Sequence, residues 1–397
     1  MRRRSRRALA LTCTIGLIAS ARPSDARACG AMVFPDHVER VGGMSRQELL
    51  VDFQESSTVL TVSAGFVDAS GELAFLLPLA SLPDPIVDGD PELFAALDGR
   101  MAPRIYISDP DEDSSGGGGI GCAKAGALDG GGGDRGNGAG EVLVLDRGET
   151  DTYTYVIVGG DSEMTIVEWL GDNGFALPAD FAAAIDSYAA DGWYFLAAKV
   201  KPDAASGALA PLELRFPAAP PETFSIPLGV AAYSLPAGED LDVTLYVNAA
   251  GGMQPASAEV TSVDANALVA VTASESNYKE LFAEAAAGGA WVREFNFAGA
   301  YYSEDELSSA LTLEQDALLQ ALAGDSRSLT RYRASLASAE LRDVTFAPAA
   351  DNSALDSTYW LEAPAEDEEG CRVTEVRGAS LLALLLVLAW PRRRRRS

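Results

Sequence analysis

Three aspartates, Asp109, Asp111 and Asp113, have the alternating spacing at which carboxylates can bind calcium. An EF-hand loop also requires glycine at its sixth position and glutamate at its twelfth, where this chain has Ser114 and Ile120. Without them the loop lacks both its sharp turn and its bidentate ligand. Two interpretations follow: a weak, irregular calcium site of carboxylate and carbonyl oxygens, or a solvated acidic loop, which the failed pattern favours.

His37 is the only histidine, so a serine–histidine or cysteine–histidine catalytic site would have to use it. It lies in no recognisable motif, and no serine stands in a G-x-S-x-G sequence. A surface or packed histidine is therefore expected. The count also excludes histidine-rich zinc sites, and the cysteines lack paired C-x-x-C spacing. The sequence indicates no catalytic residue and no cofactor, apart from the calcium alternative.

Acidic side chains dominate the middle of the chain. Residues 29–370 hold 56 acidic and 16 basic residues, a net charge of about −40. Phosphate backbones are repelled by such a body, which excludes nucleic acid as a partner. With so many acidic residues, many pairs could serve as the two carboxylates of a glycoside hydrolase. No single pair therefore identifies a catalytic site. A secreted hydrolase with a carboxylate pair therefore remains an alternative.

Four cysteines are present, at positions 13, 29, 122 and 371. The first falls in the N-terminal leader described below and the last in the C-terminal tail. Cys29 and Cys122 are then free to form a disulfide in an oxidising compartment. That disulfide would close a loop of about 90 residues and contribute ~4 kcal/mol in the chain-entropy model. The alternatives are two unpaired thiols or a modified Cys29.

Several aromatic residues could form a platform for a carbohydrate or a peptide. Aromatic residues at alternating strand positions more commonly pack half-buried against a sheet, and this is the expectation here. The residues are Tyr153, Tyr155, Trp193, Tyr194, Tyr301 and Tyr302.

The N-terminus has the organisation of a secretory signal peptide. An arginine-rich start is followed by an apolar run over residues 8–19 and a small-x-small cleavage site ending at Ala28. The run is too short to span a bilayer, which takes ~20 apolar residues. Cleavage after Ala28 would make Cys29 the first mature residue. Lipidation of Cys29 is then an alternative to a free N-terminal cysteine. Residues 5–9 partly resemble a twin-arginine signal, so two export routes stay open.

The C-terminus combines Cys371, the apolar run 379–390 and five arginines at 392–396. A helix over that run reaches only ~18 Å, short of a ~30 Å hydrocarbon core. Residues 370–397 resemble the C-terminal sorting tails of myxobacterial exported proteins, the MYXO-CTERM type. The resemblance implies processing and anchoring at Cys371 by dedicated machinery, with removal of the helix and the arginines. A plain C-terminal membrane anchor is the alternative, and either places the body outside the cytoplasm.

Between these ends the sequence predicts an α+β fold, with a mainly antiparallel β-sheet core and several packed helices. Strand-length apolar segments begin near residues 48, 58, 72, 105, 141, 152, 193, 212 and 241, and two more are expected at 258–263 and 268–271. Helices are expected from residues 90, 162, 178 and 303. We divide the chain into a signal peptide (1–28), a main body (29–250) with a flexible Gly/Asp-rich loop (109–140), a C-terminal part of the body (251–347), an acidic tether (348–370) and a tail (371–397) with a short hydrophobic helix.

Sequence blocks along the body are similar to those of an exported bacterial family, domain of unknown function 2330. They include Ala28-Cys29-Gly30, residues 58–62 and 74–79, Asp90 to Asp98, residues 102–105, Glu168 to Pro178 and residues 191–197. The resemblance covers roughly residues 28–250 and extends more weakly to about 345. It implies export and a shared core; the family brings no known catalytic residues.

The sequence thus favours an uncharacterised exported protein of the cell envelope, working as a non-enzymatic binding or structural module. Its expected partners are the membrane through the tail, the export and processing machinery, and an extracytoplasmic ligand. The alternatives are the secreted hydrolase and a calcium-dependent surface module.

Overall fold

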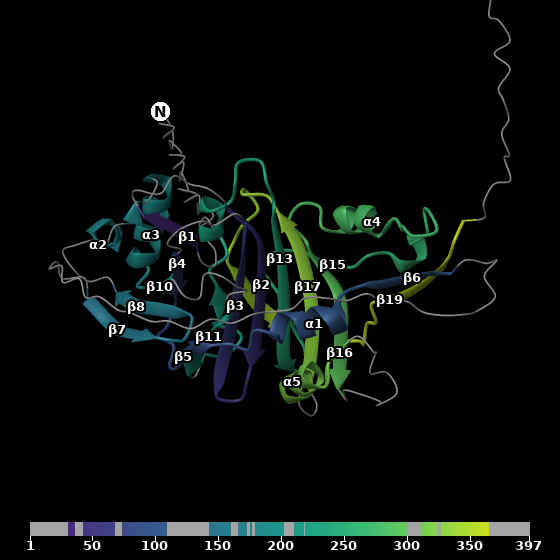
Figure 1. The fold of residues 1–397 in the computed structure, drawn as a ribbon, viewed down its shortest axis with the longest axis horizontal. Helices are drawn as coiled ribbons and strands as arrows, with labels where there is room; N and C mark the ends of the chain where they lie inside the picture. The colour runs from purple at the N-terminus through teal and green to yellow at the C-terminus, as the bar shows by residue number, and fades with distance from the viewer. Residues whose placement is uncertain are drawn as a thin grey trace, which may run out of the picture.

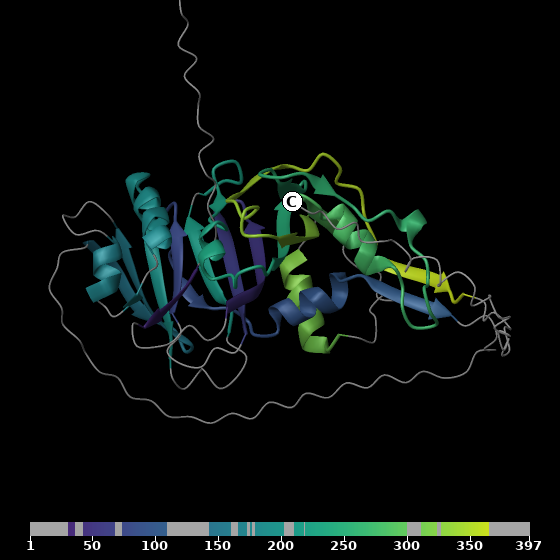
Figure 2. The ribbon, with the colours of Figure 1, turned by 90° about the horizontal axis from the view of Figure 1, so that it is seen from above.

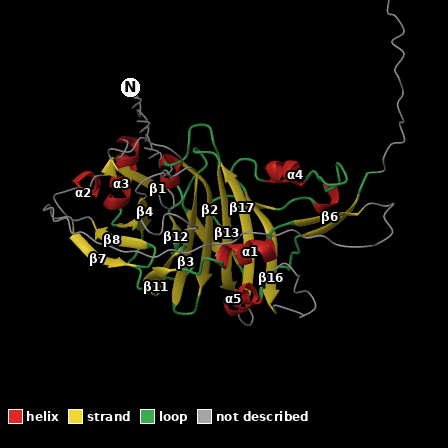
Figure 3. Ribbon diagram, in the orientation of Figure 1, coloured by secondary structure: helices red, strands yellow, loops and turns green. Residues whose placement is uncertain are grey.

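The computed structural model describes residues 31–35, 43–67, 74–108, 143–159, 166–172, 175–176, 179–201, 210–217, 219–299, 311–323 and 327–364. Figure 1 shows these residues as two sheets side by side, with helices on their faces. The secondary-structure view in Figure 3 shows that strands make up most of the body. The predicted α+β class with a mainly antiparallel core is confirmed.

An eight-stranded sheet forms the centre of the molecule. Its order is β15 (Val260–Thr261), β16 (Trp291–Gly299), β17 (Arg327–Leu336), β13 (Leu241–Ala250), β2 (Gly43–Phe53), β3 (Ser57–Val67), β11 (Leu212–Pro217) and β5 (Ile86–Asp88). Neighbours are antiparallel except β13–β2 and β15–β16, which are parallel. Strands β13 and β17 pair along ten residues each, so residues on either side of position 250 belong to one sheet.

A six-stranded antiparallel sheet lies beside it, in the order β7 (Leu143–Glu149), β8 (Tyr153–Gly159), β10 (Tyr194–Val200), β4 (Ala74–Leu79), β1 (Ala31–Pro35) and β9 (Phe175–Ala176). Helices α2 (Ile166–Asp172) and α3 (Ala179–Ala190) pack on one face together with the 3₁₀ turn η1 (Val230–Tyr233). Apolar residues of the opposite face, such as Leu77 and Leu196, join the largest core cluster.

That cluster fills the space between the two sheets, which Figure 2 shows next to each other. Side chains alternate along a strand, so Leu49, Val51 and Phe53 of β2 point into it with Val243 and Leu245 of β13. We call this side of the eight-stranded sheet the inner face. The opposite side, the outer face, is covered by α1 (Leu93–Met101) and α5 (Leu313–Ala323), whose apolar residues pack on Leu50, Tyr246 and Leu329.

Smaller elements complete the body. A three-stranded sheet has the order β12 (Ser225–Ile226), β18 (Val344–Pro348) and β14 (Met253–Pro255). The helix α4 (Tyr278–Ala285) packs on Val292, and η2 (Ala265–Ala267) is a short 3₁₀ turn. A parallel two-stranded ribbon of β6 (Arg104–Ser108) and β19 (Thr358–Glu362) projects from one end (Figure 2).

Two expectations from the sequence differ from the structure. Residues 348–362, the first part of the predicted tether, belong to the fold, because β19 pairs with β6 and Leu355 forms a bridge with Asn296. Residues 268–271 form no strand, and their β-pairing within the described residues is limited to the isolated bridge Ala270–Ser276. The predicted loop 109–140 and the tail helix 379–390 lie outside the described residues. Within the described residues, no helix has both the length and the apolar character to cross a membrane.

Candidate functional site

Most residues singled out from the sequence lie outside the described part of the chain. This holds for His37, for the calcium candidates Asp109, Asp111 and Asp113, for Cys29 and Cys122, and for the processing residues Ala28 and Cys371. The disulfide, the processing sites and the calcium site therefore stay predictions. Among the described residues, no group of three or more histidine, cysteine, aspartate or glutamate side chains could hold a metal ion.

The proposed aromatic platform is divided between the two faces of the six-stranded sheet. Tyr153 is buried in the inter-sheet core, where its hydroxyl donates to the carbonyl of Ala210 at 2.7 Å, and Tyr155 and Tyr194 pack against the same core. Trp193 packs instead in the cluster under α2 and α3, 5.0 Å from the ring of Tyr188. Tyr301 and Tyr302 lie outside the described residues. The described members serve as packing residues.

A buried charged network on the outer face was not foreseen. Arg331 of β17 contacts the carboxylate of Glu294 and donates to Asp98 Oδ1 of α1 at 2.8 Å. The Glu294 side chain is 0% exposed and that of Arg331 5%. The strand register shifts between Arg293 and Phe295, so Glu294 is the extra residue of a β-bulge. A bulge re-aims a side chain, and here it places a carboxylate beside Arg331.

Two tyrosines complete this network. The Tyr278 hydroxyl, at the start of α4, donates to Glu294 Oε1 at 2.7 Å. The Tyr246 hydroxyl accepts a longer hydrogen bond from Arg331 Nε, at 3.5 Å. Burial raises the pKa of Tyr246 to about 12, and burial also raises the pKa of Tyr278. Both hydroxyls therefore keep their protons at neutral pH, and Tyr278 remains the donor to Glu294.

A polar pocket of about 340 Å³ opens beside this network. It lies where β2, β13 and β17 meet the C-terminal end of α1 and the start of α4. Charged or polar side chains line it together with residues of the segment that joins α1 to β6. The lining residues are Arg46, Asp98, Ala102, Pro103, Ile105, Asp242, Thr244, Tyr278, Arg331 and Arg333.

Each arginine of the pocket is held by an acidic or aromatic neighbour. Arg46 donates to Glu48 at 2.7 Å. Arg333 lies 3.5 Å from Asp242 and places its guanidinium 4.4 Å from the centre of the Phe282 ring. Ion pairs and cation–π contacts restrict guanidinium groups that would otherwise be mobile. The pocket therefore offers fixed donors and acceptors of both charges.

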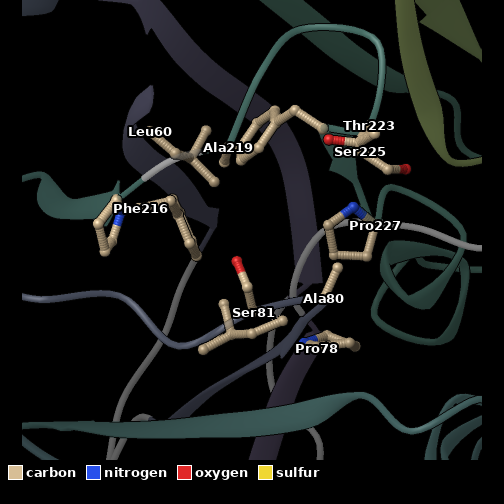
Figure 4. Close-up of a pocket in the computed structure, with 12 residues that line it drawn as sticks. Leu60, Pro78, Ala80, Ser81, Phe216, Ala219, Thr223, Ser225 and Pro227 are labelled. Atoms are coloured by element: carbon tan, nitrogen blue, oxygen red, sulfur yellow. The ribbon is translucent and has the colours of Figure 1, made fainter. Parts of the chain in front are cut away.

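A second pocket, of about 260 Å³, lies between the two sheets, next to β3, β4 and β11. Pro78, Ala80 and Ser81 lie opposite Leu60 and Ala219 across it (Figure 4). Its walls are mainly proline, alanine, leucine and phenylalanine side chains, with Ser81, Thr223 and Ser225 as the polar groups. None of its described lining residues is charged, so these residues can select a ligand only by shape and a few hydrogen bonds.

Glu294 cannot act on a ligand, because Arg331 and the Tyr278 hydroxyl hold its two oxygens inside the protein. It anchors the wall of the pocket. Asp98 and Asp242 are the carboxylates that face the pocket, and their side chains are 41% and 47% exposed. This arrangement can bind a polar ligand through charge-assisted hydrogen bonds.

Sequence reasoning missed this site because Arg331 and Glu294 are 37 positions apart and meet through strand register. One signal was present. Arg331 and Arg333 are two residues apart in a strand, hence on one face, and with Arg327 they form an arginine-rich strand in a body that has only 16 basic residues.

Known structures resemble the chain weakly. A mutated baculovirus P35 after caspase cleavage matches with 9% sequence identity, 80% coverage of this chain, 99% coverage of that chain and a TM-score of 0.30. Baculovirus P35 itself matches with 10% identity, 82% and 98% coverage, and a TM-score of 0.30. No curated protein matches the sequence.

One protein family does match over most of the chain. Its description is an uncharacterized protein conserved in bacteria, and the match spans residues 23–313. This range contains both sheets except β17, and it includes Arg46, Asp98, Asp242, Tyr278 and Glu294 of the site. The chain belongs to the bacterial family domain of unknown function 2330.

Proposed function

We propose that the protein is an exported, envelope-anchored binding module whose polar pocket holds a small extracytoplasmic ligand without turning it over. The signal peptide is removed after Ala28, and the tail attaches the body to the membrane through processing at Cys371. The export machinery and the C-terminal processing machinery are its transient partners. The proposal requires no cofactor and no nucleic acid.

The polar pocket is the observation that carries the proposal. Its wall contains guanidinium, carboxylate and hydroxyl groups that are already positioned by Glu294, Glu48 and Phe282. Preorganised polar groups of this kind bind a ligand with little loss of side-chain freedom. The buried carboxylate of Glu294 positions Arg331 and Tyr278 and does not face the pocket. This arrangement supports ligand binding over catalysis.

Location is tested on the full-length protein in cells. Fractionation should recover it in the envelope, and intact mass should show loss of residues 1–28 together with the state of the disulfide, any lipid and the tail. Full-length, uncut protein in the cytosol contradicts the proposal.

Binding is separated from turnover with the variants Asp98→Asn and Asp242→Asn. A broad hydrolase screen of the wild type should give no turnover, whereas thermal-shift screening of small polar compounds should give stabilising ligands that both variants bind more weakly. A turnover that either substitution abolishes would establish the carboxylate-pair hydrolase instead. A melting temperature that rises with calcium and falls with chelator supports the calcium-dependent module.

A further inference from the structure

We infer that the polar pocket recognises a zwitterion of the size of an α-amino acid or a short peptide, with its carboxylate at Arg333 and Arg46 and its ammonium at Asp242 and Asp98. The inference rests on the proposed binding function and names the ligand class of the same pocket.

The first support is the loose pair between Arg333 and Asp242. Their closest atoms, Arg333 Nη2 and Asp242 Oδ2, are 3.5 Å apart, beyond the usual 2.7–3.2 Å of an N–H···O hydrogen bond. The side chains are 33% and 47% exposed, so a ligand can reach both. Phe282 holds the guanidinium from behind at 4.4 Å. A zwitterion between the two groups replaces one weak contact with two charge-assisted ones.

Asp98 provides a second acceptor for an ammonium group. Its Oδ1 accepts from Arg331 at 2.8 Å, and within the described part of the chain no protein donor contacts its Oδ2. Arg46, the register partner of Asp242 in the neighbouring strand β2, directs one terminal nitrogen to Glu48 at 2.7 Å, and a guanidinium has five N–H donors in total. Both groups therefore retain capacity for a ligand.

Charge explains why a zwitterion fits better than a simple anion. Among the residues that the structure describes, three arginines and two aspartates line the pocket, and Glu48 and Glu294 contact two of these arginines directly, so the local charges nearly balance. The surrounding body has a net charge of about −40 and repels anions at long range. A cation gains nothing from the three guanidinium groups. A ligand that has both charges and no net charge is matched to the pocket and is not repelled by the body.

The volume of the pocket and its apolar lining residues limit the size and the side chains of the ligand further. A volume of about 340 Å³ is near the lower end of small-molecule sites, which start at ~300 Å³. Ala102, Pro103 and Ile105 are apolar residues of the lining, which suits a small aliphatic side chain. L-Alanyl-L-alanine has both termini and two methyl groups, so it is a suitable probe.

The test is calorimetric titration of the full-length protein with L-alanyl-L-alanine, with its N-acetyl derivative and with its C-terminal amide. Blocking either end removes one charged contact and is expected to weaken binding about tenfold or more. Arg333→Gln and Asp242→Asn should each weaken binding of the unblocked dipeptide by a similar factor. A higher salt concentration should also lower the affinity of the wild type for the dipeptide, because the contacts are ionic.

Arg215→Gln is the matched control. Arg215 is a similarly exposed arginine, paired with Glu213 at 3.8 Å, and it does not line the polar pocket. This variant should bind the dipeptide as the wild type does, and the melting temperatures of all variants report whether they fold.

The outcomes separate the two proposals. Equal affinity for the N-acetyl derivative and the free dipeptide would mean that the ammonium is not recognised, and it overturns the zwitterion inference. Absence of binding by all three probes overturns it too. The envelope location and binding of other polar compounds would survive either result, since fractionation and thermal-shift screening measure them independently.

Discussion

On the inner face of the eight-stranded sheet, Leu49, Val51 and Leu245 lie in one continuous apolar core with the six-stranded sheet. On the outer face of the same sheet, Arg331 of β17 contacts Glu294 and Asp98 and lies 6.0 Å from the centre of the Tyr246 ring. Burial of apolar area stabilises the inner face. A buried ion pair gives little net stability, because desolvation offsets the attraction between its charges. The comparison indicates that the inner face holds the fold together, whereas the outer face holds the pocket.

The largest effect is expected for removal of the central arginine of the outer face. Arg331→Met leaves the carboxylate of Glu294 buried without its charged partner and should lower the free energy of unfolding by about 3–5 kcal/mol. Urea denaturation measures it. Arg215→Met, at a pair whose side chains are 36% and 30% exposed, should cost less than about 1 kcal/mol. The double variant Arg331→Met with Glu294→Leu should regain part of the loss, because it leaves no buried, unpaired charge. An equal or larger loss in the double variant contradicts the comparison.

Truncation on the inner face should have a comparable but purely packing-based effect. Leu245 is 0% exposed, so Leu245→Ala should lower the free energy of unfolding by about 2–5 kcal/mol through lost burial and a cavity. Val269 is 53% exposed, and Val269→Ala should stay within about 0.5 kcal/mol of the wild type. Unlike Arg331→Met, Leu245→Ala leaves the pocket groups in place, so dipeptide affinity should be retained. Loss of binding in Leu245→Ala would show that the faces are coupled.

Much of this sheet is predictable because its strands alternate or run apolar over the length of a strand, as strands buried on one or both faces do. Residues 48–54, 58–67 and 241–247 were assigned from that pattern, and β2, β3 and β13 contain them apart from Gln54 at the end of the first. The segment 268–271 has the composition of a strand but lies in a polar turn. Asn277 Oδ1 accepts from the Val269 amide, and the Val271 amide donates to the Glu275 carbonyl. Local polar groups there satisfy the backbone and leave Val269 and Val271 exposed.

Other parts depend on contacts that a linear pattern does not contain. Strand β19 has the aromatic, strand-forming residues Tyr359 and Trp360 within an acidic and proline-containing stretch, whose overall composition favoured a tether. Its partner, β6, is more than 240 residues away in the chain. The pocket likewise depends on the register between β16 and β17 and on a single bulge. Register is fixed by the whole sheet, so the meeting of Arg331 with Glu294 could not be assigned from either residue alone.

A smaller effect is expected at the polar end of the inner face, where residues 351–355 cover β16 and β17. Gly252 has a φ of +77°, and an added Cβ would lie 2.3 Å from Asn352 Oδ1. Asn352 accepts from Ser328 at 2.7 Å and is part of the buried hydrogen bonds around Asn296. Gly252→Ala combines backbone strain of about 1–2 kcal/mol with displacement of Asn352.

The adjacent Gly251 is the control for that prediction. Its φ is +83°, but an added Cβ would meet no atom of the described residues within 4 Å, so Gly251→Ala should show the backbone strain alone. Chemical denaturation of both variants gives the difference, which measures how strongly residues 351–355 are held to the sheet. Equal losses of unfolding free energy in the two variants would mean that residues 351–355 add nothing to stability. This is the behaviour expected of a solvated tether.

The smallest effect concerns the ionisation of Asp351, which joins the same segment to β16. The Ser353 amide donates to Asp351 Oδ1 at 2.8 Å and Arg293 donates to Oδ2 at 2.8 Å. The Ser353 hydrogen bonds, with a further contribution from Arg293, lower the pKa of Asp351 from 3.8 to about 2. Because the folded state favours the charged form, the contribution of Asp351 to stability is complete above about pH 4 and is lost as the pH falls towards 2. Denaturation midpoints of the wild type and Asp351→Asn should therefore differ at neutral pH and converge across that window. Other carboxylates titrate in both proteins, so the difference isolates Asp351. If the difference between the two denaturation midpoints stayed constant down to pH 2, the Ser353 and Arg293 contacts would not hold residues 351–355 on the sheet. Packing alone would then hold this segment on the inner face.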